Sequence, residues 1–204
     1  MQERVLIVMA HPRAESLSNA LAERYAEAAV AAGAEVAWLR LAEMRFDPSL
    51  HAGHAGPQAL EADLVEAQER LRWATQTVWV FPVWWGSFPA VLKGFFDRVL
   101  VPGFAFRYRA GGKIERLLGG RRARVIMTHD WPRWAYWLYL GAPAHRVIDR
   151  ATLGFCGFDP VRITSFHEVI HSTPAARAAW LDAVTRAARQ DLGGAPRSRL
   201  AALP

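Results

Sequence analysis

Apolar positions recur along the chain with two different periods. Short unbroken apolar runs are typical of strands buried on both faces of a parallel sheet. One such run predicts a strand over residues 5–9, and further strands are expected over 34–41, 77–81, 123–128 and 161–166. Apolar residues at helical spacing predict helices over 18–32, 58–74, 88–100, part of 133–152, and 174–192. Because strands and helices alternate, the pattern predicts an α/β protein with right-handed crossovers and a doubly wound parallel sheet, covered by helices on both faces.

Turn and cap residues agree with these elements. Gly33 ends the first predicted helix, and Pro89 stands in the first turn of the helix over 88–100. Thr173 is a suitable N-cap for the last helix, with Pro174 in its first position. Residues 101–120 are rich in glycine and aromatic side chains and predict a long loop. We expect one domain over residues 1–192 and a poorly ordered tail over 193–204.

The composition is that of a globular protein. The chain has 204 residues, of which 52% are hydrophobic and 22% charged, so a sizeable core is expected rather than disorder. No apolar run approaches the ~20 residues that span a bilayer. The first run has six residues and meets His11 and Pro12, which indicates a strand rather than a signal peptide. Cys156 is the single cysteine, which fits a reducing cytoplasm, and we expect it to be buried.

The formal charge is +6, and the isoelectric point is about 10.2. A basic balance favours anionic partners such as phosphates, nucleic acid or an acidic membrane surface. It is equally compatible with an arginine-rich chain that has no such partner. No nucleic-acid-binding motif is present to favour that class.

Candidate chemistry lies in loops that follow strands, because ligands of open parallel sheets bind at the carboxyl ends of the strands. The first loop, over 11–21, reads HPRAESLSNAL and places Ser16, Ser18 and Asn19 just before a helix. Free N–H groups and the helix dipole make such a position an anion site. The loop has no glycine, unlike a P-loop, so we expect it to hold one phosphate. Alternatively, Ser18 or Asn19 is only an N-cap.

Two further loops also follow the carboxyl ends of predicted strands. Residues 82–89 read PVWWGSFP, in which Trp84 and Trp85 would supply apolar walls for a flat ring unless they are core residues. In the loop over 128–131, His129 and Asp130 follow a strand directly, and His129 is a candidate proton donor unless this loop is merely solvated.

Other features are weaker. Trp134, Trp137 and Leu138 share one helical face, which indicates a packed face, a dimer interface or a substrate lid. His51 and His54 have no third ligand nearby, so no metal site is expected. No Gly-x-Ser-x-Gly elbow supports nucleophilic hydrolysis.

Taken in order, four segments resemble one known family. AHPRAESLSNAL, FPVWWGSFPAVLKGFFDRVL, PGFAFRY and GFCGF resemble the flavodoxin-like NAD(P)H quinone reductases over residues 3–192. That family includes DT-diaphorase enzymes, bacterial quinone reductases and ancillary subunits of potassium efflux systems. The part over 82–98 is the most specific. The resemblance implies a flavodoxin-like five-stranded sheet of order 2-1-3-4-5, a bound flavin and a homodimer with the active site at the interface.

The resemblance also implies roles for individual residues. The loop that holds the flavin phosphate matches His11, Ser16, Leu17 and Ser18. The loop along the flavin ring matches Pro82, Val83, Trp84, Trp85 and Gly86, and the other ring edge matches Thr128, followed by His129 and Asp130. A segment that reaches the partner's substrate pocket matches Phe106, Arg107 and Tyr108, and Trp131 is a further candidate for substrate binding.

The chain departs from the family in two places. Relatives of the DT-diaphorase type have Thr-Thr-Gly-Gly after the fourth strand and then a Tyr and a His over the flavin, whereas this chain has Thr-His-Asp-Trp. The proton donor is therefore open among His129, Tyr136, Tyr139 and His145. The chain also lacks the C-terminal extension that helps to hold the adenosine half of FAD, which favours FMN over FAD.

The implied function is flavin-dependent NAD(P)H oxidoreduction, by ping-pong two-electron hydride transfer to a quinone or a similar flat electrophile. Two alternatives stay open. One is a regulatory flavin-binding subunit of a potassium efflux transporter, in transient association with the membrane. The other is a flavodoxin-type electron carrier, although such carriers are typically acidic. The acceptor, and the choice between NADH and NADPH, stay open as well.

Overall fold

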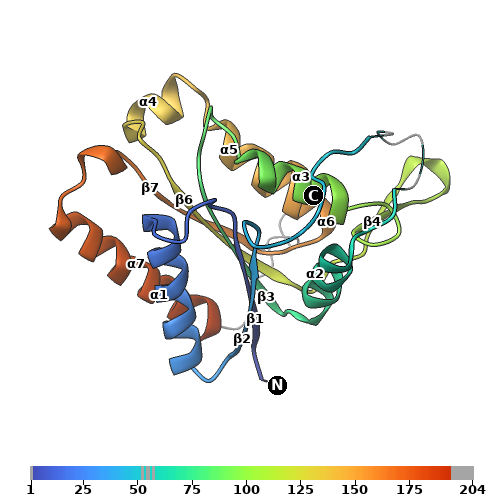
Figure 1. Cartoon of the computed structure of the whole chain (residues 1–204), viewed down its shortest axis with the longest axis horizontal. Helices are drawn as coiled ribbons and strands as arrows, with labels where there is room; N and C mark the ends of the chain where they lie inside the picture. Colours follow the sequence, from blue (N-terminus) through green and yellow to red (C-terminus); the bar gives the residue numbers. More distant parts are fainter. Residues whose placement is uncertain (1, 52, 54–55, 57, 194–204) are drawn as a thin grey trace.

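The computed structural model describes residues 2–51, 53, 56 and 58–193. Five parallel strands form the central sheet: β1 (Arg4–Met9), β2 (Glu35–Arg40), β3 (Gln76–Pro82), β6 (Arg122–Thr128) and β7 (Val161–Phe166). Their order is β2-β1-β3-β6-β7 (Figure 1). Since β6 and β7 are the fourth and fifth strands of this sheet, the predicted order 2-1-3-4-5 and the doubly wound fold are confirmed.

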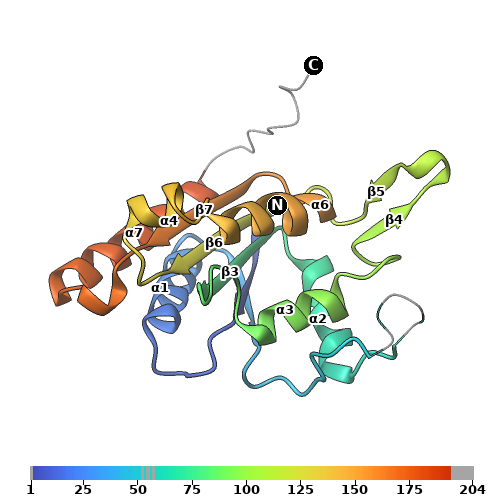
Figure 2. The same ribbon diagram turned by 90° about the horizontal axis from the view of Figure 1, so that it is seen from above.

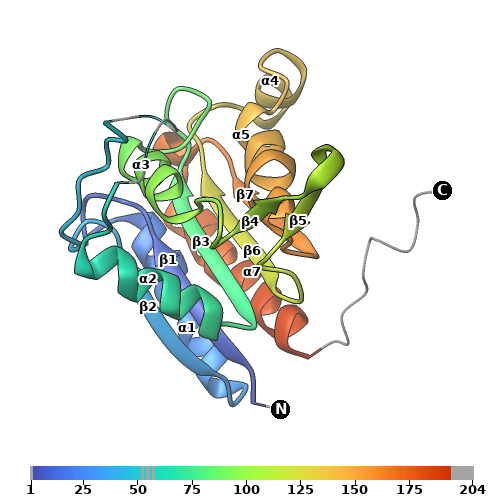
Figure 3. The ribbon, with the colours of Figure 1, turned by 90° about the vertical axis from the view of Figure 1, so that its right-hand side faces the viewer.

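Helices cover both faces of the sheet (Figure 3). One face carries α1 (Leu17–Ala31) and α7 (Pro174–Leu192). The other carries α2 (Ala62–Trp73), α3 (Ala90–Val99), α5 (Pro143–Arg146), the π-helix η2 (Val147–Leu153) and α6 (Gly154–Cys156). The two apolar layers follow from alternation along the strands. In β1, for example, Ile7 packs towards α1, whereas Leu6 and Val8 face the α2 and α3 layer.

The remaining elements refine the predictions. The segment over 133–152 is partly helical, as predicted, and begins with α4 (Arg133–Leu138). Thr173 caps α7 by accepting a hydrogen bond from the backbone N–H of Ala176, and Pro174 follows it. Cys156 is buried, as predicted, and burial raises the pKa of its thiol to about 12. A short 3₁₀ helix, η3 (Val169–His171), follows β7.

One loop prediction was wrong in part. The segment over 101–120 contains an antiparallel hairpin of β4 (Phe106–Tyr108) and β5 (Ile114–Arg116), joined through the short helix η1 (Ala110–Gly112). Gly111 and Gly112 both have positive φ, so they allow the tight reversal between two strands too short to show a periodic pattern. The hairpin projects from the body of the protein on the side away from α4 and α7 (Figure 2).

Two predictions about segments cannot be compared with the structure. Apart from Gly193, the predicted tail lies outside the described residues, and so does His54. Among the residues that are described, no helix is both long and apolar enough to cross a bilayer.

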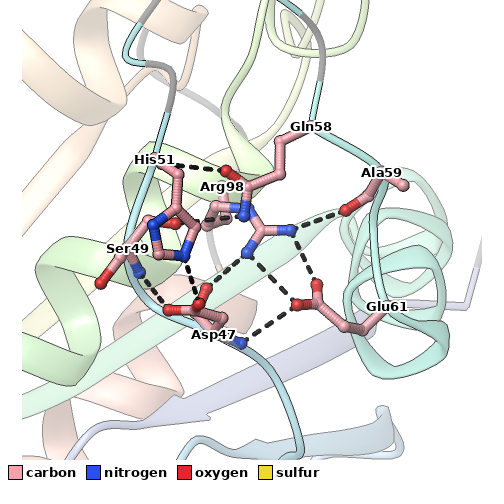
Figure 4. Close-up of polar contacts among 7 residues, drawn as sticks. All are labelled: Asp47, Ser49, His51, Gln58, Ala59, Glu61 and Arg98. Atoms are coloured by element: carbon pink, nitrogen blue, oxygen red, sulfur yellow. Dashed lines mark hydrogen bonds and ion pairs between the residues drawn. The ribbon is translucent and has the colours of Figure 1, made fainter.

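A buried arginine attaches the long segment after β2 to the core (Figure 4). Arg98 of α3 is almost fully buried, donates hydrogen bonds to the carbonyl groups of Asp47 and Ala59, and pairs with the Glu61 carboxylate at 2.8 Å. One turn earlier, Gly94 lets Pro48 approach so closely that an added Cβ would overlap it. A side chain from one helix thus satisfies two carbonyl groups and one carboxylate in a segment without regular structure.

We predict that Arg98→Met lowers the free energy of unfolding by about 2–4 kcal/mol, because it leaves these acceptors without their donor. Lys93→Met on the same helix is the control. It breaks only an exposed pair with Asp97, worth about 0.5 kcal/mol. Denaturation in guanidinium chloride measures both variants. Equal effects of the two substitutions would contradict the assigned role of Arg98.

Candidate active site

Three loops meet at the carboxyl edge of the sheet, where β1, β3 and β6 end. They enclose a cleft of about 400 Å³. Its lining residues are His11, Arg13, Glu15, Ser16, Leu17, Ser18, Pro82, Val83, Trp84, Thr128, His129, Asp130, Val169 and Arg177. The structure therefore brings together ten of the residues predicted for a flavin site, from segments far apart in the sequence.

One end of the cleft is suited to an anion. Ser16 is the N-cap of α1, and its Oγ accepts a hydrogen bond from the N–H of Asn19 at 3.1 Å. The first N–H groups of any helix lack intrahelical acceptors, and Leu17 and Ser18 begin α1 at the cleft wall. Arg13 and Arg177 add two positive charges to the lining.

Sequence reasoning missed both of these arginines. Arg13 lies inside the first loop but was not distinguished from the other charged residues. Arg177 belongs to α7, and only folding brings it to this loop, so no local signal identifies it.

Asn19 is not part of this cleft. Its side chain donates to Glu23 at 2.8 Å and accepts a hydrogen bond from Arg40 at 2.9 Å. The alternative that Ser18 or Asn19 is the N-cap was also wrong, because Ser16 has that role.

The second loop contains a tight turn. Trp84 and Ser87 exchange backbone hydrogen bonds of 3.0 and 2.9 Å, and the two central residues, Trp85 and Gly86, have φ of 52° and 72°. A left-handed conformation at both positions suits glycine but costs a tryptophan about 1–2 kcal/mol. The turn separates the two tryptophans. Trp84 lines the cleft and contacts His11 edge-to-face at 5.9 Å, whereas Trp85 is fully exposed.

These positions correct the prediction for this loop. Trp85 and Gly86 do not line the cleft, so the structure shows one aromatic wall from this loop, not two. The alternative of two core tryptophans was wrong too, because neither is buried.

The third loop places the side chain of His129, which is shielded from solvent, in the wall of the cleft. His129 is almost fully buried, so the solvated alternative was wrong, and within the described part of the chain neither of its ring nitrogens has a hydrogen-bond partner. Its ring stacks on His167 at 4.4 Å and contacts Tyr136 at 4.4 Å. Desolvation lowers the pKa of His129 to about 3, so the ring is neutral at pH 7. Asp130 Oδ1 accepts a hydrogen bond from the N–H of Ile170 and so holds η3 near the cleft.

Two other predicted donors join this cluster. Tyr136 Oη lies 3.1 Å from His145 Nδ1, and both side chains are buried. Burial raises the pKa of Tyr136 and lowers that of His145 to about 4. Tyr139 is largely exposed and takes no part. His167 was missed by sequence reasoning, because it follows a different strand and only the pairing of β6 with β7 places it beside His129.

The residues predicted for substrate binding lie apart from the cleft of their own chain. Phe106 packs on Phe155 at 5.0 Å, and Arg107 pairs with Glu115, so both belong to the projecting hairpin. Tyr108 is exposed on the same hairpin. Trp131 is half exposed and does not line the cleft.

The aromatic face of α4 is not packed within the chain. Trp134, Trp137 and Leu138 are all exposed, so an interface or a lid remains open for them. His51 pairs with Asp47. Throughout the described ranges, no three side chains form a group suitable for a metal ion.

Comparison with known proteins agrees with this geometry. A family model described as a flavodoxin-like fold matches residues 3–192. The chain is 33% identical to NAD(P)H dehydrogenase [quinone] 1 of Rattus norvegicus over 203 residues, covering 88% of this chain and 74% of the rat protein. It is 32% identical to an uncharacterized NAD(P)H oxidoreductase of Haemophilus influenzae over 127 residues, covering 60% of this chain and 62% of that protein, less than two thirds of its length.

A solved structure of another protein has a similar fold. The NAD(P)H:quinone oxidoreductase of Methanothermobacter marburgensis superposes with a TM-score of 0.76 at 25% identity, covering 93% of this chain and 96% of that one.

The buried histidines predict a loss of stability in acid. The unfolded chain takes up protons on His129 and His145 below about pH 6.5, whereas the folded chain holds them neutral down to about 3 and about 4. Their stabilising contribution is complete above the unfolded pKa and is lost as the pH falls towards the folded values. Each adds a slope of about 1.4 kcal/mol per pH unit.

We therefore expect His129→Asn to make the fall in unfolding free energy between about pH 6 and about pH 4.5 shallower by one such slope. Denaturant titrations at several pH values measure it. His171→Asn, at an exposed position, should keep the wild-type slope. An unchanged slope in the His129 variant would show that this ring is not held neutral.

Proposed function

This chain belongs to the flavodoxin-like fold family, and from that premise we propose that it is a flavin-dependent NAD(P)H oxidoreductase that reduces quinones or similar flat electrophiles. The proposal rests on one observation: three loops converge on a single cleft. The cleft has an end suited to an anion, an aromatic wall formed by Trp84, and a wall formed by the buried His129. The names of the rat and Methanothermobacter relatives support the same activity.

The cleft residues fit FMN. Its phosphate would lie against Ser16, the first N–H groups of α1, Arg13 and Arg177. These groups form a single anion-binding end, which suits one phosphate. Pro82, Val83 and Trp84 would follow one edge of the ring, with Thr128 and His129 at the other. Both His129 nitrogens lack partners within the described chain, and a polar ring edge would supply them.

Bound there, FMN would supply the hydride-transfer chemistry between NAD(P)H and the acceptor. The chain would position the flavin and the substrate, exclude water from the site, and donate a proton to the reduced acceptor. Its neutral His129 adds no positive charge beside the ring. The hydroxyl of Tyr136, at 3.1 Å from His145 Nδ1, holds a proton in the same cluster and is the donor that the geometry favours. Tyr139 is too exposed and too isolated for this role.

We further propose that the active unit is a homodimer. The projecting hairpin carries Phe106, Arg107 and Tyr108 away from the cleft of its own chain, so these residues can reach a cleft only in a second chain (Figure 2). Trp134 and Leu138 of α4 are exposed, and they form an apolar surface that such a partner would cover. A cytoplasmic location stays a prediction, and the transporter subunit and the electron carrier stay alternatives to the proposed function.

The decisive experiment is an absorbance spectrum of the purified protein before and after NADPH is added without oxygen. We expect flavin bands near ~450 nm that bleach rapidly and return when a quinone is added. A flavin that binds but is not reduced by either nicotinamide donor would overturn the enzymatic proposal. Failure to bind FMN or FAD after reconstitution would overturn the flavin site itself.

Variants of the two arginines test the anion-binding end. Arg13→Gln and Arg177→Gln should each weaken FMN binding by about tenfold or more, since a hydrogen bond to a charged group is worth about 1.5–3 kcal/mol. Arg186→Gln, an exposed position on α7 outside the cleft, is the charge-matched control. Fluorescence titration with FMN measures all three. Wild-type affinity in both cleft variants would place the phosphate elsewhere.

A further inference from the structure

A second and larger cavity runs along the outer edge of the sheet. It is a groove of about 780 Å³, lined by residues of the edge strand β7, its neighbour β6 and the helices α4 and α5. Figure 3 shows these strands and helices. Its lining residues are Arg124, Arg133, Trp137, His145, Arg146, Asp149, Arg150, Val161, Arg162, Ile163 and Ser165. We call it the arginine groove.

The groove carries a strong excess of positive charge, with five arginines and one aspartate in its lining. Two of the arginines share one carboxylate within the fold. Arg124 and Arg162 pair with the fully buried Asp191 at 2.6 and 2.9 Å. These pairs hold both guanidinium groups at the base of the groove, and the three side chains together keep one net positive charge.

The other three arginines have no such partner. Arg133, Arg146 and Arg150 are exposed, and none forms an ion pair within the described part of the chain. Arg146 and Arg150 are four residues apart, on the same side of consecutive helical turns, and Arg133 stands at the start of α4. Three guanidinium groups that line one cavity would attract a doubly charged anion, because each presents a planar fork of donors.

The groove also offers an aromatic surface. Trp137 lines it and is 45% exposed, so part of its ring can stack on a flat base while the ring also contacts His145 at 4.9 Å. A phosphate-binding cluster beside an exposed indole is the combination expected for a nucleotide, rather than for a simple inorganic anion.

The groove and the flavin cleft share a wall. His145 lines the groove, His129 lines the cleft, and their parallel rings are 6.0 Å apart. Tyr136 contacts both rings. The two cavities therefore adjoin on opposite sides of these three side chains.

We propose that the arginine groove binds the adenosine end of NADPH, with the ribose 2′-phosphate on Arg133, Arg146 and Arg150 and the adenine on Trp137. This inference rests on the proposed function, because it assigns the donor for the same reaction. A phosphate monoester carries about −1.5 to −2 charges and three acceptor oxygens. NADH has a hydroxyl group at this position, so the groove selects NADPH over NADH. Arg13 and Arg177 lie in the cleft and serve a different phosphate.

Binding of nucleotide fragments to the FMN-loaded protein tests the groove without turnover. Isothermal titration calorimetry compares adenosine 2′,5′-bisphosphate, 5′-AMP and inorganic phosphate. We expect the bisphosphate to bind about tenfold or more tightly than 5′-AMP, and inorganic phosphate to bind more weakly than either. The double variant Arg146→Gln/Arg150→Gln should abolish the preference for the bisphosphate. Arg186→Gln, which changes charge at an exposed position outside the groove, should retain it.

Kinetics provides the second measurement. In the double variant, the ratio of kcat/KM for NADPH to that for NADH should fall by about tenfold or more. The two substitutions are at exposed positions without ion pairs, and an unchanged thermal transition verifies that the variant is folded.

The possible failures differ from one another. If the wild-type flavin is reduced by NADPH but the donor ratio is unchanged in the double variant, the groove assignment is wrong and the enzymatic proposal stands. Inorganic phosphate binding as tightly as the bisphosphate would overturn the nucleotide assignment. If the bisphosphate binds but neither donor reduces the flavin, the enzymatic proposal falls, and the assignment of NADPH falls with it.

Discussion

Burial of β1, β3 and β6 on both faces is the constraint from which the rest of the structure follows. Parallel strands inside two apolar layers can be joined only by crossovers that run outside the sheet, so all their carboxyl ends open at one edge. The loops after these three strands therefore meet, although they are distant in sequence. The cleft is a consequence of sheet topology before it is a consequence of any single side chain.

Exclusion of water at that edge determines the protonation states of the side chains beside the cleft. His129, Tyr136 and His145 pack on one another out of contact with water, and burial keeps both imidazoles neutral at pH 7. The same rings have a second role, since they separate the flavin cleft from the arginine groove. One small cluster of aromatic and histidine side chains thus supplies the candidate proton donor and forms the wall between the two cavities.

The net charge of +6 indicates a ligand site only after the arginines in ion pairs are distinguished from those without one. Arg98 and Arg124 are buried and paired with Glu61 and Asp191, so they belong to the architecture. Arg146 and Arg150 are exposed without ion pairs in the described chain and are free to bind a ligand. Sequence alone could not distinguish an anion-binding protein from an arginine-rich one, because both have the same composition.

The order of the strands was predicted from the resemblance of four segments to a known family. The amino-acid sequence by itself determined the strands, most helices and the loops that form the cleft. Those features depend on local periodicity, caps and motifs, which neighbouring residues encode. Tertiary structure alone decided that Trp85 points out while Trp84 points in, that Arg177 and His167 join loops far from them in sequence, and that a basic groove lies beyond His145. These features arise from contacts between distant segments, and no local pattern records which residues the packed sheet will bring together.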